Sequence, residues 1–142
     1  MRRGFSLPEL LVVLGIIALV TLLAIPRLGD ILDWVAADGA ARDVTTALAV
    51  ARGAAISQST LARLEIGPDS LRIDIRQDGV WNPYRRYPGP GGSGVQLEVS
   101  NPEVIYGPSG LGWGTANSTI TLRRGDRVET VTTSRVGRVK RW

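Results

Sequence analysis

Residues 1–28 read MRRGFSLPELLVVLGIIALVTLLAIPRL, and this stretch decides the architecture of the chain. The sixteen residues Leu10–Ile25 are strongly apolar, except for one glycine and one threonine. A helix over 5–25 has 21 residues, which is enough to cross about 30 Å of hydrocarbon. Two arginines precede the run, as in a membrane anchor whose positive end stays in the cytoplasm. Because no small-residue cleavage pattern follows the run, we expect this helix to remain on the mature chain.

One acid stands at the front of this apolar run. Glu9 is unfavourable there, because an unpaired carboxylate in an apolar medium is poorly solvated or takes up a proton. The segment Ser6-Leu7-Pro8-Glu9 fits the S-x-x-E capping box, in which Ser6 caps the helix and Glu9 reaches back to its backbone N–H. Pro8 fits the first turn, where an N–H would have no intrahelical partner. The residues alone leave Glu9 with this structural role or with a partner outside the chain.

The order of these features resembles the N-terminus of the type IV pilin-like proteins. A short basic leader ends in Gly4, the motif FSLPEL follows, and the apolar helix then reaches Pro26. The resemblance implies that a prepilin peptidase cleaves after Gly4 and that the new terminal residue, Phe5, becomes N-methylated. It also implies that Glu9 assists assembly into a helical filament and that the helix bends or melts at Pro26. The simpler alternative for Pro26 is that it marks the membrane exit.

The implied assembly role of Glu9 is physically reasonable. After cleavage, Phe5 carries a cationic amine in the same apolar layer as the carboxylate of Glu9. An acid on one subunit and an amine on its neighbour neutralise each other where neither is hydrated, and removing one partner leaves the other charge unpaired. The capping box and the filament contact are compatible, because the first belongs to the monomer and the second to the assembled state.

Composition excludes several classes of site. The chain has 142 residues, enough for one domain beside the N-terminal helix, and it contains neither cysteine nor histidine. Disulfides, thiolate or imidazole metal sites and nucleophile–histidine pairs are therefore absent from the sequence. We expect no enzymatic activity and no cofactor. The formal net charge is +4, and residues 123–142 carry seven basic against two acidic side chains.

The pattern beyond Pro26 remains helical to about 57–60. Apolar and small residues recur there at steps of three and four: Leu28, Ile31, Leu32, Val35, Val44, Leu48, Ala51 and Ala55. Because small residues dominate the second half of this stripe, we expect a sheet to approach it closely. From Leu61 the period becomes two, which predicts short strands within 61–66, 71–77, 95–99, 103–106, 118–124, 127–133 and 137–142. The intervening segment 77–94, rich in proline and glycine, is expected to be irregular.

These elements predict an α+β fold, in which a long N-terminal helix packs on a small antiparallel β-sheet head. The resemblance to type IV pilin-like proteins further implies a prepilin leader over 1–4, a transmembrane and filament-core helix over 5–26, and a periplasmic or extracellular head over 27–142 that includes the second half of the helix. Before assembly the protein would be a single-pass inner-membrane protein, and afterwards it would be in the periplasm, the pilus or the cell surface. Its expected partners are other pilin or pseudopilin subunits, the prepilin peptidase and the inner membrane.

Two motifs in the head invite a functional interpretation that the local pattern does not favour. Arg124-Gly125-Asp126 spells an adhesion tripeptide, but it separates two alternating runs, as a hairpin turn does. The segment 81–92, WNPYRRYPGPGG, interleaves aromatic and basic residues like some single-strand binders. We favour a loop whose aromatic side chains cover the sheet edge, and keep contact with a neighbouring subunit as an alternative.

The basic end of the chain carries a second resemblance. The run from 104 to 142 is similar to the H-type minor pseudopilins of type II secretion and the related FimT-like minor pilins. Some FimT-like members bind DNA through a C-terminal Gly-Arg-x-Arg motif. Here Gly137, Arg138 and Val139 match, Lys140 replaces the second arginine and Arg141 follows. Lysine retains the charge but loses the bidentate fork.

This resemblance implies DNA contact by Arg138, Lys140 and Arg141. The alternative is a solvated edge strand whose charges prevent further strand pairing. The function expected from the sequence is therefore that of a minor type IV pilin, a structural subunit that assists DNA binding and uptake in natural transformation. The alternative is an H-type minor pseudopilin of a type II secretion system.

Overall fold

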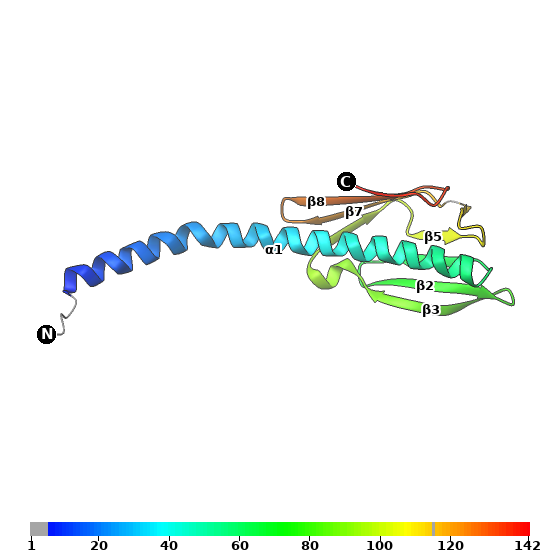
Figure 1. The fold of residues 1–142 in the computed structure, drawn as a ribbon, viewed down its shortest axis with the longest axis horizontal. Helices are drawn as coiled ribbons and strands as arrows, with labels where there is room; N and C mark the ends of the chain where they lie inside the picture. The colour runs from blue at the N-terminus through cyan, green and yellow to red at the C-terminus, as the bar shows by residue number, and fades with distance from the viewer. Residues whose placement is uncertain (1–5, 115) are drawn as a thin grey trace. The chain divides into compact units, whose positions relative to one another are not determined.

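The computed structural model describes residues 6–114 and 116–142, without the side chains of residues 24–26. It contains two compact units, one that ends at Leu32 and one that comprises Asp33–Trp142. A single helix, α1 (Leu7–Ser57), contributes residues to both units (Figure 1).

The N-terminal unit presents an apolar helical surface. From Leu7 to Leu23 its large apolar side chains are 47–74% exposed. Among the described residues, α1 is the one helix long and apolar enough to cross a membrane. The expected membrane-spanning segment is thus helical, and no part of its most apolar window is buried in the protein.

The end of α1 agrees with the sequence prediction. Ser59 has a φ of 51°, in the left-handed region, which stops the helix. The backbone N–H of Thr60 donates to the carbonyl of Ala55 at 3.1 Å, so one of the last helical carbonyls has a partner. The predicted end at 57–60 is confirmed.

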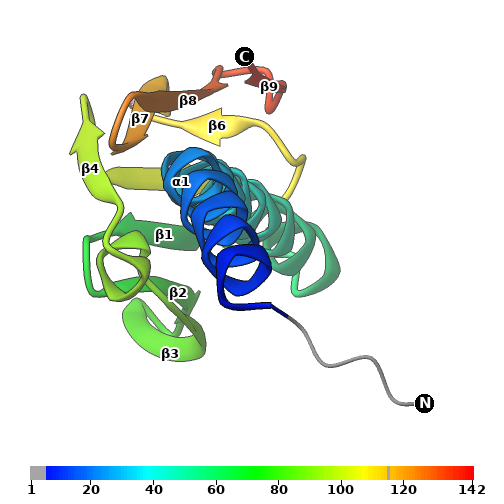
Figure 2. The same cartoon turned by 90° about the vertical axis from the view of Figure 1, so that its left-hand side faces the viewer.

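The head contains two antiparallel sheets. The first has five strands in the order β3-β2-β1-β5-β6, with bounds β1 (Ala62–Ile66), β2 (Ser70–Gln77), β3 (Val80–Pro88), β5 (Glu103–Tyr106) and β6 (Gly112–Trp113). The second has four strands in the order β4-β7-β8-β9, with bounds β4 (Gln96–Val99), β7 (Ser118–Arg124), β8 (Arg127–Thr133) and β9 (Val139–Arg141). A short 3₁₀ helix, η1 (Pro90–Ser93), precedes β4. Figure 2 shows β1, β2 and β3 on one side of the α1 segment that belongs to the head, and β6, β7, β8 and β9 on another side.

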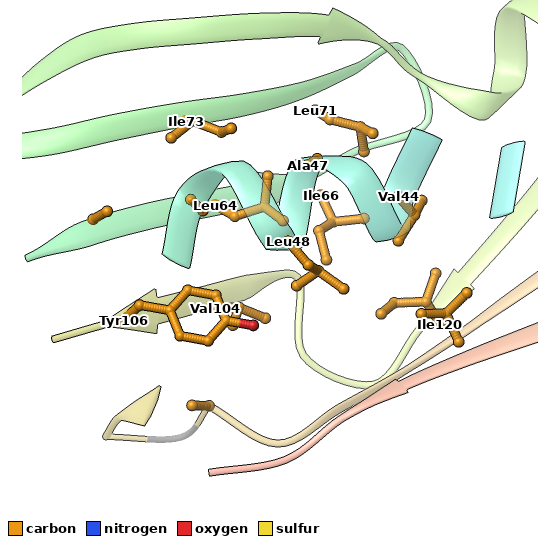
Figure 3. Close-up of a cluster of buried hydrophobic side chains, with 14 of the residues drawn as sticks. Val44, Ala47, Leu48, Leu64, Ile66, Leu71, Ile73, Val104, Tyr106 and Ile120 are labelled. Carbon is orange, nitrogen blue, oxygen red and sulfur yellow. The ribbon is translucent and has the colours of Figure 1, made fainter. Parts of the chain in front are cut away.

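One hydrophobic core joins the helix to both sheets. Its fully buried members include Val44 and Leu48 of α1, Leu64 of β1 and Ile120 of β7 (Figure 3). The helix meets the sheets mainly through small side chains, since Ala37, Ala40, Ala41, Ala47, Ala51, Ala54 and Ala55 are all buried. The small-residue stripe is therefore the face of the helix that the sheets cover, as predicted.

A buried polar contact also connects the sheets. The hydroxyls of Tyr106 on β5 and Thr133 on β8 lie 3.2 Å apart. Burial raises the pKa of Tyr106, so its hydroxyl stays protonated and can donate to Thr133.

The first part of the predicted stripe does not belong to the core. Leu28, Ile31, Leu32 and Val35 are 53–61% exposed, whereas Ala37 is fully buried. Helical periodicity identified an apolar face correctly, but it did not show where the strands begin to cover that face. The packed part of the stripe starts at about Ala36.

The prediction that 77–94 is irregular was wrong. Asp78 and Gly79, with φ of 51° and 82°, form a two-residue turn, and β3 returns along β2. Positive φ at both central residues is the conformation of a type I′ hairpin turn, which favours Asp-Gly. Pro83 is tolerated because β3 is the edge strand of its sheet. The pairing register shifts beside it, between Ile73 and Asp74.

Candidate functional site

The helix start forms the capping box that the sequence predicts. The backbone N–H of Glu9 donates to Oγ of Ser6, and the backbone N–H of Ser6 donates to Oε2 of Glu9. The nitrogen–oxygen distance is 3.4 Å in both bonds. The N–H of Leu10 donates to the Ser6 carbonyl at 3.1 Å, which closes the first turn. Glu9 is exposed at the edge of the apolar surface. Its carboxylate is therefore accessible to a cation from another molecule.

The other N-terminal candidates are only partly described. Gly4 and Phe5, the predicted cleavage pair, lie outside the described residues, and so does the side chain of Pro26. The helix assignment continues through position 26. The predicted cleavage, methylation and bend remain predictions.

The second candidate site is the last strand. β9 pairs with β8, with Val139 opposite Thr133 and Lys140 opposite Thr132. The backbone N–H of Trp142 donates to the carbonyl of Thr130 at 3.0 Å, so the pairing extends one residue beyond the strand. Successive side chains of a strand point to opposite faces. The tail therefore presents one set of side chains to the core and another to solvent.

Arg141 belongs to the set that faces the helix. Its guanidinium forms an ion pair with Asp38 of α1 and a second one with Glu129 of β8, at 3.0 Å. Asp38 also pairs with Arg42 one helical turn later, at 2.9 Å. The hydrogen bond from Arg141 is the main cause that lowers the pKa of Asp38, and the bonds to Glu129 and Asp38 raise the pKa of Arg141. Arg141 is thus committed to contacts within the head.

Arg138 and Lys140 differ from Arg141. Both side chains are exposed, and neither forms an ion pair among the described residues. Nζ of Lys140 lies 4.9 Å from the centroid of the Trp142 ring, a cation–π contact that leaves the ammonium accessible. Of the three predicted DNA-binding cations, the structure leaves these two available to an anion.

A clamp that the sequence did not reveal holds the turn between β8 and β9. Arg52 of α1 donates from Nε to the carbonyl of Gly110 at 2.9 Å and from Nη1 to the carbonyl of Gly137 at 3.2 Å. Gly137 has a φ of 74°, and a Cβ there would lie 2.7 Å from the Gly110 carbonyl oxygen. The residue before Arg138 is therefore fixed to the helix, and glycine is required at that position.

The adhesion-like tripeptide is a hairpin turn, as predicted. Gly125 and Asp126 connect β7 to β8, and Gly125 has a φ of 54°. Arg124 donates from Nε to Oδ1 of Asp33 at 2.9 Å, so its side chain anchors the turn to the helix. The tripeptide has a structural role in the head.

The aromatic segment near β3 is mostly a strand with an exposed edge. Trp81 lies under the guanidinium of Arg63, 4.6 Å from ring centroid to Cζ. Tyr87 packs against the core, while Tyr84 is 42% exposed. The predicted loop that covers the sheet edge was wrong, because this segment is itself the edge strand β3, with Trp81 against Arg63 of β1 and Tyr87 against the core.

An exposed apolar helix that starts with a capped acid, together with a two-sheet head built on a helix, defines a pilin-like subunit. Residues 1–25 match the prokaryotic N-terminal methylation motif, and residues 40–137 match the family described as type II transport protein GspH. The chain belongs to the GspH family, within the type IV pilin-like minor pilins and pseudopilins.

Individual relatives come from both branches of this group. The pilin-like protein PilA1 of Thermus thermophilus is 29% identical over 154 residues, which cover 98% of this chain and 97% of PilA1. The type IV minor pilin FimU of Pseudomonas aeruginosa has the same fold, with a TM-score of 0.62 at 17% identity over 73% of this chain and 86% of FimU. The minor pseudopilin EpsH from the type 2 secretion system of Vibrio cholerae gives a TM-score of 0.61 at 16% identity over 75% of this chain and 95% of EpsH.

Proposed function

We propose that this chain is a minor subunit of a type IV pilus that contacts DNA through its basic tail during uptake. The observation that carries the pilus assignment is the similarity to a pilin-like protein over nearly the whole length of both chains. The N-terminal methylation motif supports insertion in the inner membrane, cleavage after Gly4 and methylation of Phe5. Assembly then moves the subunit from the membrane into the pilus.

Assembly in this proposal depends on Glu9. In the monomer its carboxylate accepts a hydrogen bond from the Ser6 backbone, which partly compensates for the poor solvation of the charge. In the filament the amine of a neighbouring Phe5 replaces or joins this donor. Because the acid and amine neutralise each other in an apolar layer, subunits lacking either one are disfavoured.

The proposed DNA contact rests on Arg138 and Lys140. Both are exposed and have no acidic partner among the described residues, whereas Arg141 pairs with two carboxylates. The Arg52 clamp on Gly137 holds the backbone next to Arg138. Cations held on a fixed backbone neutralise phosphates without first losing much conformational freedom, which favours non-specific DNA binding.

The second candidate is an H-type minor pseudopilin of a type II secretion system. The match to the GspH family over residues 40–137 favours it, and so does the fold shared with EpsH. In this case the basic tail contacts other subunits at the filament tip, and DNA has no role.

Deletion of the gene separates the two candidates. If the protein is a minor pilin for uptake, the deletion strain loses natural transformation and piliation while exoprotein secretion continues. If it is a pseudopilin, secretion fails and transformation is retained. Complementation with the wild-type chain controls for effects on neighbouring genes.

A further inference from the structure

The outer face of the second sheet is lined by rows of hydroxyl groups. On β7 and β8 the core-facing side chains alternate with Thr119, Thr121, Thr130 and Thr132. The register places Thr119 opposite Thr132 and Thr121 opposite Thr130. Because paired side chains on one face of a sheet lie about 5 Å apart, these four hydroxyls form a compact polar surface.

The tail continues both threonine rows. Lys140 is opposite Thr132 in the strand register. Trp142 is hydrogen-bonded to Thr130 in both directions, with N–H to carbonyl distances of 3.0 and 3.3 Å. One row therefore ends in an ammonium and the other in an indole, with about 7 Å between Cα atoms two residues apart on a strand.

Trp142 combines an exposed ring with a strand-paired backbone. It is 71% exposed although it is a large aromatic side chain, and its backbone is fixed by β8. Lys140, the one lysine in the sequence, contacts this ring. An exposed ring on a fixed backbone is a platform on which a flat group can stack without ordering the protein first.

The charged side chains of this face favour an anionic partner. Lys140 is joined by Arg123 of β7 and by the exposed Arg138 beside β9, while Glu98 of β4 is the acid on the same face. The β9 edge of this face therefore presents two cations, Lys140 and Arg138, close to the indole in sequence, whereas Glu98 lies on β4 at the opposite edge of the sheet. Phosphates paired with cations and bases stacked on aromatic rings are the two contacts made by proteins that bind single-stranded nucleic acid.

We infer that this face, formed by Lys140, Trp142 and the four threonines, binds single-stranded DNA, with an unpaired base stacked on Trp142 and a phosphate on Lys140. The inference rests on the proposed DNA function and specifies the form of DNA that binds best. A base in duplex DNA is already stacked on its neighbours and is not free to cover the indole, whereas every unpaired base has an exposed π-face.

The test uses the full chain in detergent with two labelled probes, a twelve-nucleotide thymidine oligomer and a blunt duplex of mixed sequence. Trp142→Ala should weaken oligomer binding about tenfold, as expected for one lost base stack, and change duplex binding less than twofold. The salt slope should stay the same, because stacking releases no counterion. Trp142→Phe should retain most of the affinity.

Controls make each outcome decisive. Trp113→Ala removes a similarly exposed indole (61%) from β6 of the other sheet and should leave both affinities unchanged. Thermal unfolding of each variant checks that the head is intact, and Trp142→Leu replaces Trp142→Ala if the latter unfolds. If loss of the ring weakens binding of both probes equally, or of neither, the proposed stacking site is wrong. Salt-dependent binding of the duplex would still support the proposed function in that case. If wild type binds neither probe, both proposals fall.

Discussion

Arg141 of β9 forms an ion pair with Asp38 of α1, a residue 103 positions earlier in the sequence. The same guanidinium contacts Glu129 of β8 at 3.0 Å, so one cation connects the helix, the last strand and its neighbour. The side chains of Asp38 and Glu129 are only 16% and 19% exposed, so water screens these ion pairs less than it would at a fully exposed site. The basic tail is therefore divided between a structural cation and two exposed ones.

Asp38→Asn should make the stability of the head less dependent on acid pH. Because the folded-state pKa of Asp38 lies below its ordinary value of 3.8, its ionised form adds stability above that pH, and this contribution is lost as pH falls through the lower folded value. The difference in Tm between wild type and variant should therefore be largest at neutral pH and should shrink below about pH 3.8. A difference that stays constant over this range would contradict the assignment.

Arg138 and Lys140 should account for the electrostatic part of DNA binding. Replacing both by alanine should lower the slope of log affinity against log salt for duplex DNA by about 1.8, since each neutralised phosphate contributes about 0.9. Arg141→Ala should instead lower the unfolding temperature and leave the slope nearly unchanged, because that side chain is ion-paired in the head. Titrations at several salt concentrations measure both slopes. If Arg141→Ala lowers the slope as much as the double substitution does, Arg141 contacts DNA and its assignment as a structural cation is wrong.

Cleavage after Gly4 should produce a mature protein that begins at Phe5. Loss of Arg2 and Arg3 lowers the side-chain charge from +4 to +2. Intact-mass measurement on protein from membranes should show this loss together with one added methyl group. Retention of Met1 in cells with an active prepilin peptidase would refute the processing prediction.

Glu9 and Ser6 can be separated by substitution. Ser6→Ala removes the hydroxyl that accepts the Glu9 N–H and should cost about 1 kcal/mol at the helix start, but it keeps the acid. Glu9→Ala should leave insertion and cleavage intact while strongly reducing incorporation into filaments. Sheared-filament yields measure both. Equal yields from wild type and Glu9→Ala would assign the acid to capping alone.

Leu48 and Val35 provide a matched pair on one helix. Leu48 is fully buried between the sheets, whereas Val35 is 53% exposed. Leu48→Ala should destabilise the head by about 2–5 kcal/mol through lost burial and a residual cavity, and Val35→Ala by about 0.5 kcal/mol or less. Denaturant unfolding of the full chain in detergent gives both values, and similar losses would mean that the core boundary is misplaced.

The sequence predicted the elements that local patterns encode. The S-x-x-E box, the alanine-rich stripe and the alternating runs each correspond to contacts within a few residues or to one face of one element. The Asp78-Gly79 turn is also a local signal, but Pro83 and Pro88 argue against a following strand unless that strand lies at a sheet edge. The division into two sheets was not predicted, because alternation does not specify which strands pair.

The division of the tail required the three-dimensional structure for a different reason. Arg138, Lys140 and Arg141 are similar in sequence, and strand alternation alone places Arg141 on the face opposite Lys140. Whether that face meets acids or apolar side chains depends on Asp38, which no local pattern connects to the tail. The Arg52 clamp on Gly110 and Gly137 likewise joins positions 58 and 85 residues away.

The ribosome synthesises β9 after every other strand of the head. At about 5–20 residues per second, a ribosome needs about 5–20 s to travel from Asp38 to Arg141. Throughout that interval the alanine face of α1 lacks its final cover, and Val139 is not yet available to pack against the core. Long-range closures of this kind slow folding. The core of the nascent head therefore remains partly exposed until β9 has been synthesised.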